Sequence, residues 1–193
     1  YNEPSTYGRI AVSDGLSVRY DFGKFSLASV TSYQYMNDKM HIDNDFLPLD
    51  YFSMGQYQNE HSFTQEFVAR SKKGGAFSWQ TGLFGFCKFL DMDAPVRFKQ
   101  YGIDNLILKN ANEYYYSKLP GNRELSFRDD NFVIYDDFYI PVYGAAAYLQ
   151  MGYNLSCFEF TAGLRVDYET SSMEYDSRST VHYKTHKDAV GYT

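Results

Sequence analysis

Cysteine is scarce in this 193-residue chain, which holds only Cys87 and Cys157, without paired spacing. Two isolated thiols exclude a disulfide scaffold and match no zinc or redox motif. Long apolar runs are also missing, so the sequence contains no membrane-spanning helix, which needs about 20 apolar residues in a row. Lys and Arg number 18 against 24 Asp and Glu, a net charge of −6. A nucleic-acid partner, which requires a basic face, is therefore not expected.

Enzyme and metal motifs are missing as well. The sequence has no nucleophile elbow, phosphate-cradling glycine loop or Cys/His pair, so we expect no enzyme activity and no cofactor. His182 and His186 have the spacing of zinc ligands on a helix, but the residues around them favour strand or loop. Residues 43–45 and 129–131 offer oxygen atoms for calcium without EF-hand spacing, and turn chemistry explains them more simply. We predict no metal site and leave calcium at these loop acids open.

Aromatic residues are what the chain has in excess, at 19% of the sequence, with 20 Tyr, 16 Phe and 1 Trp. They alternate with polar residues. The clearest case runs from residue 158 to 169, where one face carries Phe158, Phe160, Ala162, Leu164, Val166 and Tyr168 and the other carries charged and small residues. This period of two predicts a strand with one apolar and one polar face, about twice as long as a strand of a soluble sandwich.

Six such strands are predicted, at about residues 16–22, 25–36, 60–70, 76–88, 143–153 and 158–169. Tight turns near residues 23, 73 and 155 join them into three hairpins, and long segments at 37–55, 89–142 and 170 onward separate the hairpins. If neighbouring strands pair, every tight turn falls at one end of the sheet. We therefore predict an all-β, antiparallel up-and-down meander.

The one-sided arrangement of turns is typical of outer-membrane barrels, which have short periplasmic turns, long outer loops and strands that alternate apolar-out and polar-in. A barrel segment leaves the strands near residues 18 and 163 as edges, which we expect to be paired with another chain, shielded by loops or closed on each other. The alternative is a soluble β-rich domain that binds a ligand or carbohydrate. The apolar face of residues 158–168 must be covered by lipid in the first case and by a core in the second.

The long middle segment predicts a helix within residues 103–116, because apolar residues recur at helical intervals without proline. Ile103, Leu106 and Ile107 are expected to face protein. The two cysteines are expected to lie near opposite rims of the sheet, too far apart for a disulfide.

Several segments together resemble TonB-dependent outer-membrane receptors. Residues 160–169 (FTAGLRVDYE) are similar to a barrel strand of that family, preceded by the small-residue strand 143–150. Residues 27–33, 63–67 and 77–84 resemble three consecutive barrel strands in the same order and spacing, so nearly the whole chain is covered. The insert around residues 101–104 resembles receptors from gut Bacteroidetes.

The resemblance implies a receptor in the outer membrane of a Gram-negative bacterium that imports a scarce nutrient of the siderophore, cobalamin or glycan class. Its partners would be membrane lipid, the rest of the barrel with its plug domain, TonB acting through the plug, and the nutrient itself. Family members have a plug and a terminal strand that do not appear in residues 1–193, and their barrels have 22 strands. We therefore expect residues 1–193 to be part of such a barrel.

Two sets of residues are candidates for function. Charged residues in mid-strand are expected to face the barrel lumen: Glu66, Arg70, Arg165 and Asp167. Aromatic residues in the presumed outer loops are candidates for stacking on a flat ligand: Tyr114, Tyr115, Tyr116, Phe46, Tyr51 and Phe52. Packing of these loop rings on one another is the equally weighted alternative.

Overall fold

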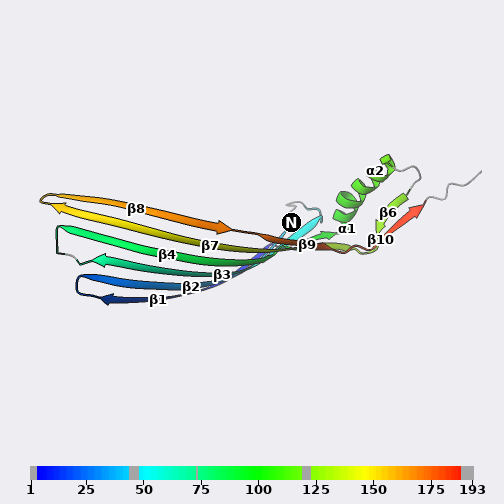
Figure 1. Ribbon diagram of the computed structural model, residues 1–193. Coiled ribbons are helices and arrows are strands. Elements are labelled where there is room, and N and C mark those ends of the chain that lie inside the picture. The colour runs from blue at the N-terminus through cyan, green and yellow to red at the C-terminus, as the bar shows by residue number, and fades with distance from the viewer. Residues whose placement is uncertain (1–3, 44–47, 73, 119–122, 188–193) are drawn as a thin grey trace, which may run out of the picture.

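The computed structural model describes residues 4–43, 48–72, 74–118 and 123–187, which form one long, twisted antiparallel sheet with a small helical unit at one end (Figure 1). Its main strands follow in chain order: β1 (Thr6–Asp21), β2 (Phe25–Asp43), β3 (Phe52–Ser71), β4 (Phe77–Asp93), β7 (Asn131–Leu155) and β8 (Phe158–Ser171). The predicted antiparallel meander is confirmed.

Two short strands continue longer ones. β5 (Val96–Lys99) extends β4 between β3 and β7, and β9 (Glu174–Ser179) extends β8 along β7. The pairing register is the same on both sides of each break, as in Asp93↔Tyr57 and Val96↔Met54. Pro95 lies at the first break, where a residue without an N–H interrupts the ladder. The sheet is therefore six strands wide, with two interruptions.

The three tight turns lie together at one end of the sheet, as the sequence predicted (Figure 1). The first turn contains Gly23 with φ of +85°, a conformation that glycine adopts without a Cβ penalty. The third turn contains Ser156, whose φ is 52°. At the other end, β6 (Arg123–Phe127) pairs with β10 (Tyr183–Lys187) as a separate two-stranded sheet.

The strands are much longer than the alternation predicted. β2 continues to Asp43, β3 starts at Phe52 and β7 starts at Asn131, so the predicted long segments contain strand as well as loop. The predicted boundaries were wrong because beyond the apolar stretch the period of two disappears from the sequence. Backbone pairing continues there without it, since the ladder needs only the N–H and C=O groups.

The predicted helix in the long connection is confirmed. It consists of α1 (Gln100–Gly102), the π-helical stretch η1 (Ile103–Leu108) and α2 (Lys109–Lys118). Ile103 is fully buried and Ile107 is half-buried, but Leu106 is 39% exposed, so the expectation for Leu106 was wrong. The wider π turn shifts Leu106 off the packed side that an unbroken α-helical period would have given it.

An amide clamp attaches the helix to β6. Asn112 Nδ2 donates to the Leu125 carbonyl at 3.1 Å, and the Leu125 N–H donates to Asn112 Oδ1 at 2.8 Å. None of the helices within the described residues is long and apolar enough to cross a bilayer.

The sheet is open, and few of its described apolar side chains are buried, Val68 and Ala146 among them. Every residue of β1 and β8 is exposed, and within the described residues β1 pairs only with β2, and β8 only with β7. The accessible area is 13700 Å², against about 9400 Å² for a compact protein of 22.4 kDa. Closure of the two edges on each other and shielding by loops are both wrong, and pairing with another chain stays a prediction.

The cysteines are free, as expected. Cys87 lies well inside β4, where it pairs with Phe63 and Tyr143, and Cys157 lies in the turn before β8. The expectation that Cys87 lies near a rim of the sheet was therefore wrong, since β4 extends to Asp93.

Gly102 gives a test of how the helical unit docks. A Cβ at Gly102 would lie 2.1 Å from the Tyr51 carbonyl oxygen, a backbone atom that cannot swing away. Although alanine favours helix, we expect Gly102→Ala to undock α1 and cost about 1–3 kcal/mol. Limited proteolysis of residues 100–118 should become faster, whereas Gly8→Ala, which meets nothing within 4 Å, should leave the rate unchanged. Equal rates for both variants would contradict this packing.

Candidate functional site

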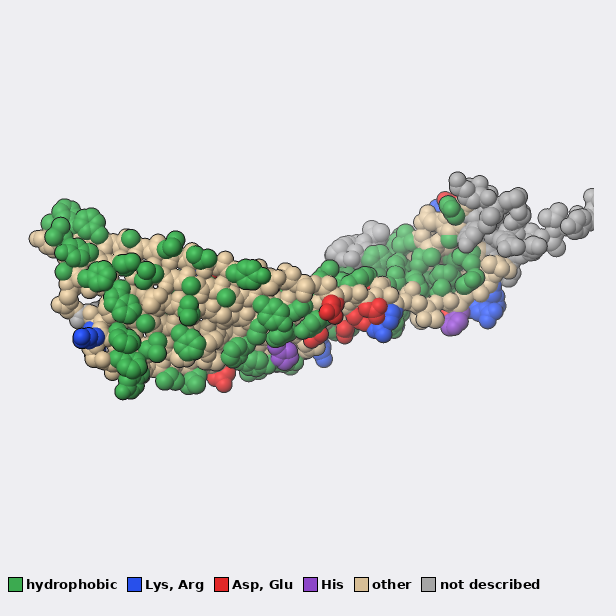
Figure 2. Space-filling view, viewed as in Figure 1, with side chains coloured by type: hydrophobic (Ala, Val, Ile, Leu, Met, Phe, Trp, Pro, Cys, Tyr) green, Lys and Arg blue, Asp and Glu red, His purple; other side chains and the backbone are tan. Residues whose placement is uncertain are grey.

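The register of the ladder sorts side chains onto two faces of different chemistry. One face, here called the apolar face, carries the alternating hydrophobic residues of all six strands. Its central members include Leu16 and Val18 of β1, Leu27 of β2, Phe67 of β3, Leu83 of β4, Leu149 of β7, and Leu164 and Val166 of β8. These side chains are exposed, Leu164 at 73%. Figure 2 shows hydrophobic side chains spread over the turn-side part of the sheet, while acidic and basic side chains gather farther along it.

Aromatic rings border the apolar face at both ends. The row nearest the turns contains Tyr20, Phe25, Phe77, Trp79, Tyr153, Phe158 and Phe160, and the far row contains Tyr33, Tyr35, Phe63, Phe89, Tyr143 and Tyr168. Neighbouring rings touch, as between Phe89 and Tyr143, whose centroids are 5.7 Å apart. From Tyr153 to Tyr143 is about 34 Å along the strand, or about 26 Å for strands tilted by about 40°.

The opposite face, here called the polar face, carries the predicted mid-strand charges. The register places Glu66 and Arg70 of β3 on it together with Arg165 and Asp167 of β8. It also holds charged residues outside the set of predicted site residues: Arg9, Arg19, Asp38, Glu60 and Lys88. Those in the long segments were missed because the sequence pattern fades where the strands extend.

A cluster around Tyr148 connects four strands, β3, β4, β7 and β8, across the polar face. The Tyr148 hydroxyl donates to Glu66 Oε1 at 3.0 Å, and Gln80 Nε2 donates to the same hydroxyl at 3.5 Å. The Arg165 guanidinium carbon lies 6.0 Å from the centroid of the Tyr148 ring, and Arg165 also binds Asp167 at 2.7 Å. The cluster therefore brings together three of the four predicted charges through a tyrosine that sequence reasoning had not chosen.

Glycine makes room for this tyrosine. Gly82 of β4 lies beside Tyr148 in the ladder, and a Cβ there would be 2.4 Å from Tyr148 Cζ. The ring lies across the glycine and thereby reaches β3. The same arrangement recurs four residues away on both strands, where a Cβ at Gly144 would meet Phe86 Cε1 at 2.1 Å. Aromatic rings thus cover Gly82 and Gly144 on the polar face.

A second polar cluster lies nearer the loops. Arg9 binds both carboxylate oxygens of Asp38 at 2.6 Å, and the Tyr7 hydroxyl donates to Asp38 at 3.3 Å. The hydrogen bonds from Arg9 hold the pKa of Asp38 below its usual range, despite the burial of that side chain. Lys88 and Glu60 form an ion pair at 3.7 Å between the two clusters. Charges on the polar face are thus largely matched in pairs.

The aromatic residues predicted to contact a ligand differ in how they are packed. Tyr51 packs edge-on against Tyr101 with centroids 5.0 Å apart, and Phe52 packs on Phe98 at 5.6 Å. Tyr114 is 63% exposed on α2. Phe46 and the side chains of Tyr115 and Tyr116 lie outside the described part of the chain. Tyr51 and Phe52 therefore show the packing of loop rings on each other that was the alternative to ligand contact.

The candidate metal ligands do not assemble among the described residues, which contain no group of three or more His, Cys, Asp or Glu side chains suited to a metal ion. Asp129 Oδ2 instead contacts His182 Nδ1 at 2.8 Å. Asn44, Asp45 and the side chain of His186 lie outside the described part.

Comparison with known proteins supports the fold. No family model matches the sequence, and no curated protein does. Among solved structures, the ferric yersiniabactin uptake receptor FyuA from Yersinia pestis matches with a TM-score of 0.60 over 92% of this chain, at 13% identity. The likeness is one of fold. This chain covers 24% of the length of that receptor, so it corresponds to part of a longer chain there.

Gly82 and Tyr148 allow a direct test of the polar-face cluster. Gly82→Ala should push the Tyr148 ring aside and break its bond to Glu66, costing about 1–2 kcal/mol in the free energy of unfolding. Gly85→Ala on the same strand is the control, because its Cβ would meet only the Gly144 carbonyl oxygen at 3.8 Å. We expect Gly85→Ala to be neutral or slightly stabilising.

A double-mutant cycle identifies the cause of that loss. With Tyr148→Phe already in place, Gly82→Ala should cost clearly less, because the bond to Glu66 is gone in both variants. Fully additive costs, measured by chemical unfolding, would contradict the proposed cause.

Proposed function

We propose that this chain forms part of the wall of an outer-membrane β-barrel receptor that binds and imports a nutrient. The observation that carries the proposal is the apolar face with its two aromatic rows. A band of about 26 Å matches the apolar belt of about 25 Å that such barrels present to lipid between aromatic girdles. The fold likeness to part of an uptake receptor supports the same assignment.

The soluble alternative is less well supported. A soluble domain would cover Leu164, Val166 and Phe160 with a second layer, yet these side chains are 57–73% exposed. No helix or second sheet packs on them within the described residues, where the only other strands, β6 and β10, lie at the far end (Figure 1). We therefore propose that lipid covers this wide apolar face.

The polar face is proposed to line the lumen. The charges Glu66, Arg70, Arg165 and Asp167 would contact water or a plug domain there. The open edges β1 and β8 would pair with the strands that complete the barrel, because an unpaired edge cannot persist in lipid. The remainder of the barrel, a plug and TonB acting through it are the partners implied by the family resemblance.

The ligand is proposed to approach from the end that carries the helical unit. Tyr114 is the first candidate for stacking on the ligand, because its side chain is exposed. Tyr115, Tyr116 and Phe46 remain candidates with it. Tyr51 and Phe52 are weaker candidates because their rings already pack on neighbours. Siderophore, cobalamin and glycan remain the substrate classes, and the Bacteroidetes-like origin of the insert stays a proposal.

Leu164 tests whether the apolar face meets lipid. Leu164→Arg places a charge near the middle of the proposed belt, and we expect it to lower the free energy of unfolding in phospholipid vesicles by about 2–4 kcal/mol. The control is Gln150→Arg, which puts the same charge one ladder step away on the polar face. Equal stability of the two variants, or folding that needs neither lipid nor detergent, would favour the soluble alternative.

Uptake by cells tests the receptor function itself. Cells that make the intact protein should accumulate a labelled ferric siderophore, cobalamin or oligosaccharide, and collapse of the inner-membrane proton gradient should stop the accumulation. Tyr114→Ala should weaken binding of the imported compound about fivefold, as expected for one stacked ring. Accumulation that is the same in cells lacking the protein, for all three classes, would reject the import proposal.

A further inference from the structure

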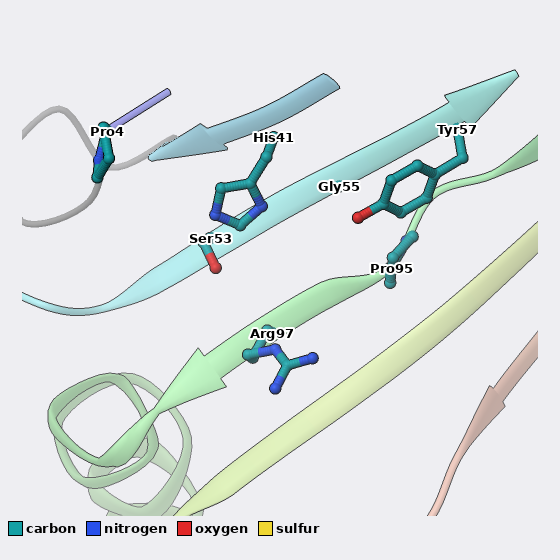
Figure 3. Close-up of a pocket in the computed structure, with 7 residues that line it drawn as sticks. All are labelled: Pro4, His41, Ser53, Gly55, Tyr57, Pro95 and Arg97. Carbon is teal, nitrogen blue, oxygen red and sulfur yellow. The ribbon is translucent and has the colours of Figure 1, made fainter. Parts of the chain in front are cut away.

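A cavity of about 480 Å³ opens on the apolar-face side of the sheet, beyond the far aromatic row (Figure 3). Its walls come from Pro4, His41 of β2, Ser53, Gly55 and Tyr57 of β3, and Pro95 and Arg97 around β5. Gly55 lies about 20 Å farther along β3 than His61, which pairs with Phe89 of the far row. The cavity is thus separate from the polar-face clusters and from the loop tyrosines.

The break in the β4–β5 strand creates this space. Pro95 interrupts the ladder, and its carbonyl accepts the Gly55 N–H at 2.8 Å, which holds the two residues together. A Cβ at Gly55 would lie 2.9 Å from Tyr57 Cε2 and 3.1 Å from Pro95 Cγ. The absence of a side chain at Gly55 therefore leaves the floor of the cavity open between a tyrosine and a proline.

The buried hydroxyl of Ser53 at the cavity has no hydrogen-bond partner among the described residues. The side chain is only 3% exposed. Burying a hydroxyl without a partner costs free energy, so such groups in native proteins need an explanation. In Figure 3 the Tyr57 hydroxyl points toward the Ser53 side of the space, and the Ser53 hydroxyl points toward the side where Arg97 lies.

The lining of the cavity carries one permanent charge, the guanidinium of Arg97. Arg97 lies opposite Ser53 in the ladder, and no ion pair or hydrogen bond joins its guanidinium to the rest of the described chain. The His41 ring adds a further nitrogen at the wall. None of the residues lining the cavity is acidic. Asp43, which faces Ser53 across the ladder, does not line it, and its N–H donates to Ser5 Oγ at 3.3 Å.

We propose that this cavity is a binding site for a phosphate-class oxyanion. The guanidinium of Arg97 on β5 and the hydroxyls of Ser53 and Tyr57 on β3 line one cavity, and they supply the charge and the donors that a tetrahedral oxyanion accepts. The bound anion gives Ser53 Oγ its missing partner and neutralises Arg97. Because the cavity lies well beyond the far aromatic row, the anion comes from solution, either free or as the phosphate group of a dissolved compound.

Calorimetric titration of the intact protein in zwitterionic detergent with inorganic phosphate, at constant ionic strength, tests the site. We expect saturable binding that weakens about tenfold or more in Arg97→Gln, since a charge-assisted hydrogen bond is lost. Arg19→Gln removes the same charge from an exposed position on the polar face and should bind like the unmodified protein. No saturable heat, or equal binding by the Arg97 and Arg19 variants, would overturn the proposal.

Ser53→Ala keeps the proposal testable if the arginine variant folds poorly. Because Ser53 Oγ has no partner in the unliganded protein, its removal should leave the unfolding midpoint unchanged or raise it, while phosphate affinity falls about fivefold. Unchanged affinity would overturn the assignment of Ser53. Co-sedimentation of the protein with vesicles that contain or lack anionic phospholipid distinguishes a lipid phosphate from a dissolved one. If the protein binds only the anionic vesicles and does not bind free phosphate, a dissolved ligand is rejected.

Discussion

Continuous hydrogen-bonded register across six strands is the constraint on which the rest of this molecule depends. Once each strand is paired without slipping, the period of two places most aliphatic and aromatic residues of the alternating stretches on one side and the charges on the other, with Phe86 and Tyr148 as exceptions on the polar face. A shift by one residue in any strand would move a row such as Phe158, Phe160 and Leu164 to the opposite side. The two interruptions, at Pro95 and before Met173, leave the register unchanged, so the sorting survives them.

Size complementarity between neighbouring strands fixes this register further. Tyr148 reaches Glu66 only because Gly82 lies between them, and Phe86 lies over Gly144 in the same way. These pairs give each strand a specific partner position, which uniform alternation alone does not. They also concentrate on the polar face, where the ion pairs Arg165–Asp167, Lys88–Glu60 and Arg9–Asp38 match charge with charge.

The two ends of the sheet differ in how they are stabilised. The turn end consists of tight connections bordered by rings that contact one another, such as Phe22 and Phe25. The loop end has helix, prolines and a small second sheet, with Ile103 and Leu108 as its buried apolar side chains. Packing there resembles that of a small unit with its own buried apolar side chains.

The sequence alone determined the hairpins, their order, the helix in the long connection and the sidedness of the strands other than residues 25–36, where Ala28 and Val30 left the faces ambiguous. These are local properties, because turn residues and a period of two or 3.6 act within a short window. It also indicated Glu66, Arg165 and Asp167 as charges of one face. It did not indicate Tyr148 as the residue that joins them, since Tyr148 and Glu66 are 82 positions apart and meet only across Gly82.

Tertiary structure alone decided what lies beyond the alternating stretches. The full strand lengths follow from backbone pairing, which leaves no side-chain pattern in the sequence. The cavity lined by Ser53, Tyr57 and Arg97 depends on a proline and a glycine that meet across two strands. Leu106 lost its expected burial because a π-helical turn rotated it outward. Each of these outcomes is set by contacts between residues distant in the chain, and no local window of sequence contains them.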